Sequence, residues 1–332
     1  MKRYGFNMLW MFYWQGKAAA EPNKKQLDFI AKRGFNFIRV PMDYRFWTKD
    51  FDYLNPNEKV FEKIDSYLAA CRERGLHMSL NLHRAPGYCI NNIEIERHNL
   101  WKDKPAQDAF VFLWEGFAKR YKGISSDELS FDLLNEPPDI GEHGFTRKRH
   151  ERIMRRTINA IRAIDADRLI ILNGIGGGGD AIPELADTGT IHSGRGYAPY
   201  TVSHYKAEWI NMPDGYKWQK PVYPGIMEHE LWDKAALKEY YKPWRQVEAT
   251  GTRIHIGEFG CYNKTPNDVA LRWLGELLEV FGEYKWGYAL WNFAGAFGIV
   301  EHGRPGTKYE LLDGFNVDRR LLELLQKNMF NL

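Results

Sequence analysis

Short runs rich in β-branched and aromatic residues alternate with longer segments of helical periodicity along this chain of 332 residues, and the alternation repeats about eight times. Such an order predicts parallel strands joined by helical crossovers. Eight consecutive strand–helix units in one chain of this size predict a (β/α)8, or TIM, barrel. The expected strands cover residues 4–9, 35–41, 76–83, 129–136, 169–174, 190–197, 253–259 and 287–293.

The alternation continues through the whole sequence without a linker or low-complexity segment, so we expect one domain over residues 1–332. Two loops are unusually long, residues 84–104 after the third expected strand and residues 198–232 after the sixth. Loops of that length are commonly functional. Both follow the carboxyl ends of strands, where barrel enzymes place their active sites.

Charge and cysteine content limit the classes of partner and compartment. The net charge of +3 is small for this length and argues against nucleic acid or an anionic membrane surface as a partner. Cys71, Cys89 and Cys261 are too few and too scattered for a disulfide framework or a metal site. No secretion signal or segment of 18 apolar residues is visible, so we expect a cytoplasmic monomer with no membrane span. The alternative is a secreted protein whose signal has been removed.

Two glutamates end strongly apolar strands, Glu136 in FDLLNE and Glu258 in RIHIGE. A single acid at a strand end is equally well explained by helix capping or by a surface ion pair. Two such acids at the converging ends of a barrel suit cleavage of a glycosidic bond, in which one carboxyl group donates a proton while the other stays ionised. An arginine beside one acid favours its charged form, and Arg39 is the candidate.

Other strand ends carry polar or aromatic residues in a specific order. The pattern RVP, LHR, NEP, GEFG and LWNF resembles glycoside hydrolase family 5, the cellulase and β-mannanase family, over essentially the whole chain. NEP alone is a weak signal, whereas five motifs in the same order are a specific one.

This resemblance implies a role for each matching residue. Glu136 would be the acid/base of a retaining hydrolase and Glu258 its nucleophile. Asn135 would hydrogen-bond the 2-hydroxyl group of the sugar as the oxocarbenium ion develops. Arg39 and Tyr197 would hold the carboxylate of the nucleophile. His83 would support the floor of the subsite that binds the reacting sugar, and Trp291 would stack beneath that sugar.

The sequence departs from the family at the end of the sixth strand. Many members carry a His-x-Tyr pair there, whereas this chain reads RGY, which puts Arg195 in the histidine position. His192 or His204 could take the place of that histidine.

Aromatic residues gather at strand ends and in the loops that follow them. Pyranose rings present apolar C–H faces on which planar indoles stack. We therefore expect an elongated sugar-binding cleft, with Trp47 and Trp209 among its residues; the alternative is that these aromatics only cover the mouth of the barrel. The tryptophans at such positions are Trp10, Trp14, Trp47, Trp101, Trp209, Trp218, Trp232 and Trp291, whereas Trp114, Trp244 and Trp273 fall in expected helices as packing residues.

Three rival functions are weaker. Gly174, Gly176 and Gly179 form a literal G-x-G-x-x-G after a strand, but the following AIPELAD is too short for the helix of a dinucleotide site. The MEHE segment at residues 227–230 suggests a metallohydrolase, but the strand-end residues are a poor set of metal ligands. A non-catalytic sugar-binding module would need the aromatics but not the paired acids.

The sequence therefore predicts a retaining hydrolase of internal β-1,4 bonds in a glucan or a mannan, without cofactor or metal. The alternative is an exo-acting β-glycosidase on imported oligosaccharides. Retention requires the two carboxyl groups to lie about 5–5.5 Å apart. Glucose and mannose differ only at the 2-hydroxyl, and the sequence does not decide between them.

Overall fold

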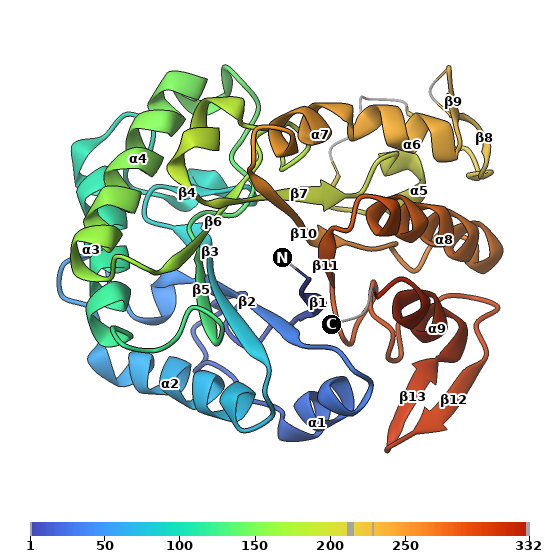
Figure 1. Cartoon of the computed structure of the whole chain (residues 1–332), viewed down its shortest axis with the longest axis horizontal. Helices are drawn as coiled ribbons and strands as arrows, with labels where there is room; N and C mark the ends of the chain where they lie inside the picture. The colour runs from blue at the N-terminus through green and yellow to red at the C-terminus, as the bar shows by residue number, and fades with distance from the viewer. Residues whose placement is uncertain (1, 211–215, 228, 330–332) are drawn as a thin grey trace. The chain divides into compact units, whose positions relative to one another are not determined.

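The computed structural model describes residues 2–210, 216–227 and 229–329 (Figure 1). The chain divides into two compact units. One unit comprises Met8–Gly194 and Val247–Ile254. The other comprises Met1–Asn7, Arg195–Gln246 and His255–Leu332.

Parallel strands form the centre of the Met8–Gly194 unit. Their registers align Phe37 with His77, Met78 with Leu129, and Ile171 with Ile191. Nearly every residue in these strands is buried, as expected for parallel strands covered on both faces. The strands are β2 (Phe37–Asp43), β3 (His77–Ala85), β5 (Leu129–Asp132), β6 (Leu169–Asn173) and β7 (Ile191–Gly196), with the short β4 (Tyr88–Cys89) antiparallel to β3.

Helices of this unit begin at residues that cap them. Asn23, Asn57 and Thr146 each accept a hydrogen bond from a backbone N–H in the first turn. The α-helices are α1 (Lys24–Lys32), α2 (Glu58–Arg72), α3 (Lys104–Arg120) and α4 (Arg147–Ile164). The 3-10 helices are η1 (Tyr44–Phe46), η2 (Ile93–Ile95), η3 (Glu142–Gly144) and η4 (Pro183–Thr188).

The second unit contains three parallel strands, in the order β1 (Tyr4–Asn7), β11 (Gly287–Leu290) and β10 (Arg253–Phe259). Two antiparallel hairpins accompany them, β8 (Gly225–Met227) with β9 (Glu230–Trp232), and β12 (Tyr309–Leu312) with β13 (Phe315–Asp318). The helices are α5 (Tyr200–Ser203), α6 (Lys234–Tyr240), α7 (Lys242–Glu248), α8 (Asn267–Glu283) and α9 (Arg319–Lys327). The long loop expected at residues 198–232 therefore contains α5 and a hairpin, with residues 211–215 and 228 outside the described part.

The chain thus has the eight parallel strands expected from the sequence, and its fold class is the (β/α)8 barrel. Most strand ends differ from the expected ones by one to four residues, and two differences affect the candidate site. The strand that begins at Leu129 ends at Asp132 rather than at Glu136. Only η4 lies between β6 and β7, because the glycines at 176–179 disfavour a helix and only a short segment remains between them and β7. Within the described residues, no helix is long and apolar enough to cross a membrane.

Candidate active site

Glu258 lies on an irregular part of β10. The pairing of β10 with β11 shifts register between Ile256 and Phe259, and such a bulge redirects the side chains within it. The Asn7 side chain donates hydrogen bonds from Nδ2 to the carbonyl oxygens of Gly257 (3.0 Å) and Leu290 (3.3 Å). The bulge is therefore fixed by a side chain from the first strand.

The carboxylate of Glu258 has two polar neighbours in its own unit. Arg195 Nη2 lies 3.4 Å from Oε1, and the Tyr197 hydroxyl donates to Oε2 at 3.2 Å. All three side chains are buried. A guanidinium and a hydroxyl donor in a buried setting both favour the ionised carboxylate.

Aromatic rings surround Tyr197. His204 meets it edge-on at 4.9 Å between ring centroids, and Phe297 contacts both rings. Burial lowers the pKa of His204 to about 4, although the charge of Glu258 opposes this shift. His204 is therefore neutral at pH 7. Of the two histidines considered from the sequence, His204 is the one whose pKa the charge of Glu258 affects. His192 instead lies near His150 in the other unit, and burial likewise lowers its pKa to about 4.

Glu136 follows β5 in the other unit and has an unusual backbone conformation. Its φ of 44° lies in the left-handed region, which costs a residue other than glycine about 1–3 kcal/mol. Two hydrogen bonds hold it: the backbone N–H donates to Asn173 Oδ1 at 3.2 Å, and the Tyr88 hydroxyl donates to its carbonyl at 2.6 Å. Strain retained in this way is typical of functional positions.

A buried polar network supports the same segment. Asp132 accepts from Arg39 Nε (2.6 Å) and from Asn173 Nδ2 (2.6 Å) through its two carboxylate oxygens. Arg39 also donates from Nη2 to Asn135 Oδ1 at 2.8 Å. In this unit, therefore, Arg39 orients Asn135 and the backbone that leads to Glu136.

The glycine-rich turn after β6 supports this loop as well. The N–H groups of Gly176 and Gly177 donate to the carbonyls of Pro138 and Pro137. Gly176 has φ of 60°, and a Cβ there would lie 2.9 Å from the Asp139 carboxylate. The turn is followed by the 3-10 helix η4, so the dinucleotide alternative lacks the long helix that it requires.

The candidate aromatic residues differ in how exposed their side chains are. Trp209 is 51% exposed and meets Tyr262 edge-on, so its indole remains available to a ligand. Trp291 is half-buried after β11. Trp47 is only 2% exposed and packs against Phe61 and Phe117. The expectation that Trp47 binds sugar is therefore corrected to a packing role, because a buried indole presents no face to a sugar.

His83 is buried and its ring meets Phe12 edge-on at 4.5 Å. The helical tryptophans Trp114, Trp244 and Trp273 are fully buried, as expected of packing residues.

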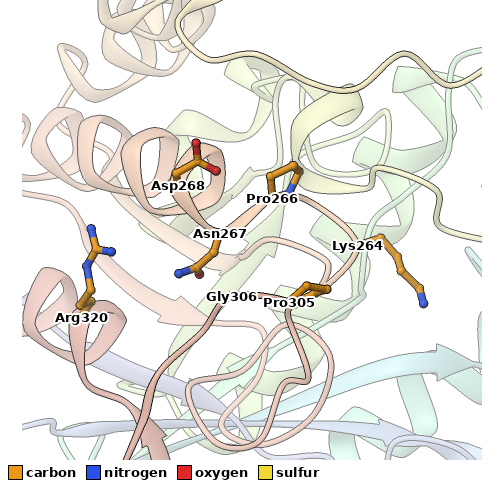
Figure 2. Close-up of a pocket in the computed structure, with 7 residues that line it drawn as sticks. All are labelled: Lys264, Pro266, Asn267, Asp268, Pro305, Gly306 and Arg320. Atoms are coloured by element: carbon orange, nitrogen blue, oxygen red, sulfur yellow. The ribbon is translucent and has the colours of Figure 1, made fainter.

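Among the described residues, no three His, Cys, Asp or Glu side chains are grouped so that they could hold an ion. Glu228 of the MEHE segment lies outside the described residues. A surface hollow at the start of α8 has charged side chains from Lys264, Asp268 and Arg320, and its lining contains no aromatic residue (Figure 2). It does not suit the apolar face of a sugar.

Comparison with known proteins decides the family. Residues 2–296 match the model described as cellulase (glycosyl hydrolase family 5). The chain belongs to glycosyl hydrolase family 5. It is a glycoside hydrolase, and its substrate is a carbohydrate.

Individual relatives agree with this assignment. Endoglucanase C of Acetivibrio thermocellus is 27% identical, over 87% of this chain and 89% of that protein. Cellodextrinase A of Ruminococcus flavefaciens is also 27% identical, over 77% of this chain and 73% of that protein. A crystal structure of a glycoside hydrolase is 57% identical and superimposes with a TM-score of 0.96, over 99% of this chain and all of that one. These matches confirm the (β/α)8 barrel and the family expected from the sequence motifs.

Sequence reasoning missed four residues that contact candidate site residues: Asn7 and Phe297 in the unit of Glu258, and Asp132 and Asn173 in the unit of Glu136. Asn7 and Asp132 had a detectable signal, since each is a polar residue inside an otherwise buried strand. Asn173 follows the same rule at the end of β6. Phe297 had none, because an aromatic residue beyond the last predicted strand resembles any other packing residue.

Proposed function

We propose that the chain is an endo-β-1,4-glucanase that acts by double displacement with net retention. Glu258 is the nucleophile and Glu136 the acid/base in this mechanism. The pairing of the Glu258 carboxylate with Arg195 and Tyr197 carries the proposal, because it keeps an ionised nucleophile in a buried position.

The first displacement forms a covalent glycosyl-enzyme. A Glu258 oxygen attacks the anomeric carbon, the glycosidic C–O bond breaks, and the proton of Glu136 passes to the leaving oxygen. Asn135, oriented by Arg39, binds the 2-hydroxyl of the reacting sugar. Trp291 and Trp209 supply apolar faces for the rings.

The second displacement regenerates the enzyme. Glu136, now a carboxylate, takes a proton from water, and the water oxygen attacks the anomeric carbon from the face opposite Glu258. The ester bond to Glu258 breaks and releases a sugar with the original configuration. Arg195 and Tyr197 hold the free carboxylate before the first attack and stabilise it again as it is released in the second.

The similarity to proteins named endoglucanase supports internal cleavage, and a glucan rather than a mannan as the substrate of this chain. Carboxymethylcellulose, galactomannan and short cello- and manno-oligosaccharides test this, with product sizes followed over time and the anomer first released read by NMR. A rapid fall in carboxymethylcellulose viscosity with β-anomeric products supports the proposal. Release of α-anomers contradicts retention, and preferential cleavage of galactomannan contradicts the glucan assignment.

A second candidate is exo action on short cello-oligosaccharides, favoured by the similarity to a cellodextrinase. It predicts that each cleavage of cellohexaose releases a sugar of one fixed small size together with the correspondingly shortened oligosaccharide, and that the viscosity of carboxymethylcellulose changes little.

A further inference from the structure

The segment after residue 296, beyond the part that matches the family model, returns to the loop that follows Glu258. We call residues 260–265 the nucleophile loop. Two side-chain hydrogen bonds join the segment to it: Asn263 Nδ2 donates to the His302 carbonyl at 2.7 Å, and Arg304 Nη2 donates to the Cys261 carbonyl at 2.8 Å. Pro305 and Gly306, which directly follow Arg304, line the same surface hollow as Lys264 of the nucleophile loop (Figure 2).

Arg304 is held in place by its neighbours. Its backbone N–H donates to His302 Nδ1 at 3.0 Å, and His302 Nε2 lies 3.0 Å from Asp318 Oδ2. Since Nδ1 accepts a hydrogen bond, the imidazole proton sits on Nε2 and is donated to Asp318. The other Asp318 oxygen accepts from the Leu321 N–H and caps α9.

The guanidinium of Arg304 is buried although only part of its hydrogen-bonding capacity is used. Arg304 is 2% exposed, and its Nε and Nη1 have no hydrogen-bond partner among the described residues. Burying a cation with unpaired donors costs free energy, and a neutral donor could satisfy the same carbonyl. Stability alone therefore does not explain an arginine here.

The opposite side of the nucleophile loop is tied to α5. The Tyr262 N–H donates to the Ser203 carbonyl at 2.7 Å, and Thr265 Oγ1 donates to the Val202 carbonyl at 2.6 Å. The Ser203 hydroxyl in turn donates to the carbonyl of Tyr197, the residue that binds Glu258. The loop is thus fixed between the Tyr197 segment and Arg304.

We propose that Arg304 is a positioning residue for Glu258, an inference that rests on the proposed function. By holding the carbonyl of Cys261, three residues after Glu258, Arg304 fixes the nucleophile loop and with it the bulge that aims the carboxylate. Asp318 acts through His302 to keep Arg304 in place.

The test compares Arg304→Met with the conservative Arg304→Lys and with Arg320→Met, a control on the exposed surface of α9. We measure kcat and KM on an aryl β-cellobioside, the melting temperature, and the rate of trapping by 2-deoxy-2-fluoro-cellobiosyl fluoride from intact mass. Because small displacements of reacting groups are costly, Arg304→Met should lower kcat and the trapping rate about 10- to 100-fold. KM should stay within about twofold, since the substrate contacts are unchanged.

Arg304→Lys should recover most of the activity, and Arg320→Met should match the wild type. Asp318→Asn keeps the α9 cap but weakens the contact to His302, so it should lower kcat in the same direction. In the double variant Arg304→Met/Asp318→Asn, the fold-reduction in kcat should be smaller than the product of the two single reductions, because both residues act in one hydrogen-bond network.

A wild-type kcat and trapping rate in Arg304→Met, with only a lower melting temperature, would overturn the proposal. Should Arg304→Met fail to fold, wild-type kcat in both Arg304→Lys and Asp318→Asn would overturn it equally. A wild-type chain that neither hydrolyses the glycoside nor is trapped would instead reject the proposed function.

Discussion

Arg195 Nη2 lies 3.4 Å from Oε1 of Glu258, and both side chains are almost completely buried. A guanidinium does not titrate below pH 12, so its charge beside the carboxylate is constant over the working range of an enzyme. The histidine usual at this position in the family would lose its charge near neutral pH. The pair therefore makes the ionisation of Glu258 independent of a second titrating group.

The first prediction concerns this pair. Arg195→Gln removes the cation that favours the ionised carboxylate, so the acid limb of the kcat/KM profile should move to higher pH. Arg195→Lys retains a cation and should leave the acid limb closer to that of the wild type. The profile is measured from pH 4 to 9 on an aryl cellobioside, and an unmoved acid limb in Arg195→Gln would contradict the role given to the pair.

The second prediction identifies the nucleophile. Glu258→Gly should abolish turnover of an aryl β-cellobioside, because no covalent intermediate can form. Azide should restore part of the activity by entering the vacated space, with α-cellobiosyl azide as the product. Absence of rescue, or the β-azide in its place, would count against Glu258 as the nucleophile.

The third prediction identifies the acid/base. Glu136→Gln should show a burst of about one equivalent of dinitrophenolate from dinitrophenyl cellobioside, because this leaving group needs no proton. Turnover should then be slow, because no base activates water. Azide should accelerate turnover and give β-cellobiosyl azide, the opposite anomer to that from Glu258→Gly. A Glu136→Gln protein that cleaves cellotetraose at the wild-type rate would exclude the role.

The fourth prediction concerns the Tyr197 hydroxyl. Tyr197→Phe removes a buried hydrogen bond to a charged group, worth about 1.5–3 kcal/mol, so kcat should fall about 10- to 100-fold. The ring contacts to His204 and Phe297 remain, so Tyr197→Phe should keep the native fold even though its melting temperature falls. Tyr284→Phe, after the end of α8, is the matched control and should retain wild-type kcat.

The fifth prediction is a loss of stability in mild acid. Burial lowers the pKa of His150 to about 3 and of His192 and His204 to about 4, against an ordinary value of 6.5. Between pH 6.5 and 4 the unfolded chain takes up protons that the folded chain does not, so the free energy of unfolding falls as pH falls. Each histidine contributes up to about 1.4 kcal/mol per pH unit.

Urea unfolding at pH 4.5, 5.5, 6.5 and 7.5 measures this slope. His150→Gln should reduce the slope by the share of one histidine, whatever its effect on stability at pH 7.5. An identical slope in the wild type and the variant would show that His150 is not protonated on unfolding.

Much of the fold could be predicted because the spacing of apolar residues within one strand or helix is visible in its own sequence. The residues of β6, with the sequence LIILN, could only be a covered strand, and the helix over residues 267–283 follows from its apolar face. Strand ends were harder to predict: β5 stops at Asp132, four residues before Glu136, and Glu136 has a left-handed conformation that no strand contains.

The contacts within the site could not be predicted in the same way. The contact of Arg195 with Glu258 depends on a one-residue register shift in β10, and the contacts of Arg39 depend on the conformation of the chain after β5; neither leaves a periodic signal in the sequence. For the same reason Trp47 was expected to bind sugar, although it follows a strand end only to turn inward against Phe61. A strand-end position predicts which side chains are near the site but not which way they point.

The left-handed backbone at Glu136 makes catalysis and thermal stability favour different residues at this position. Glycine adopts a φ of 44° freely and asparagine does so at little penalty, whereas glutamate does not. A chain selected only for thermal stability would replace the glutamate at position 136, and an inactive Glu136→Asn protein should have a higher melting temperature than its active parent.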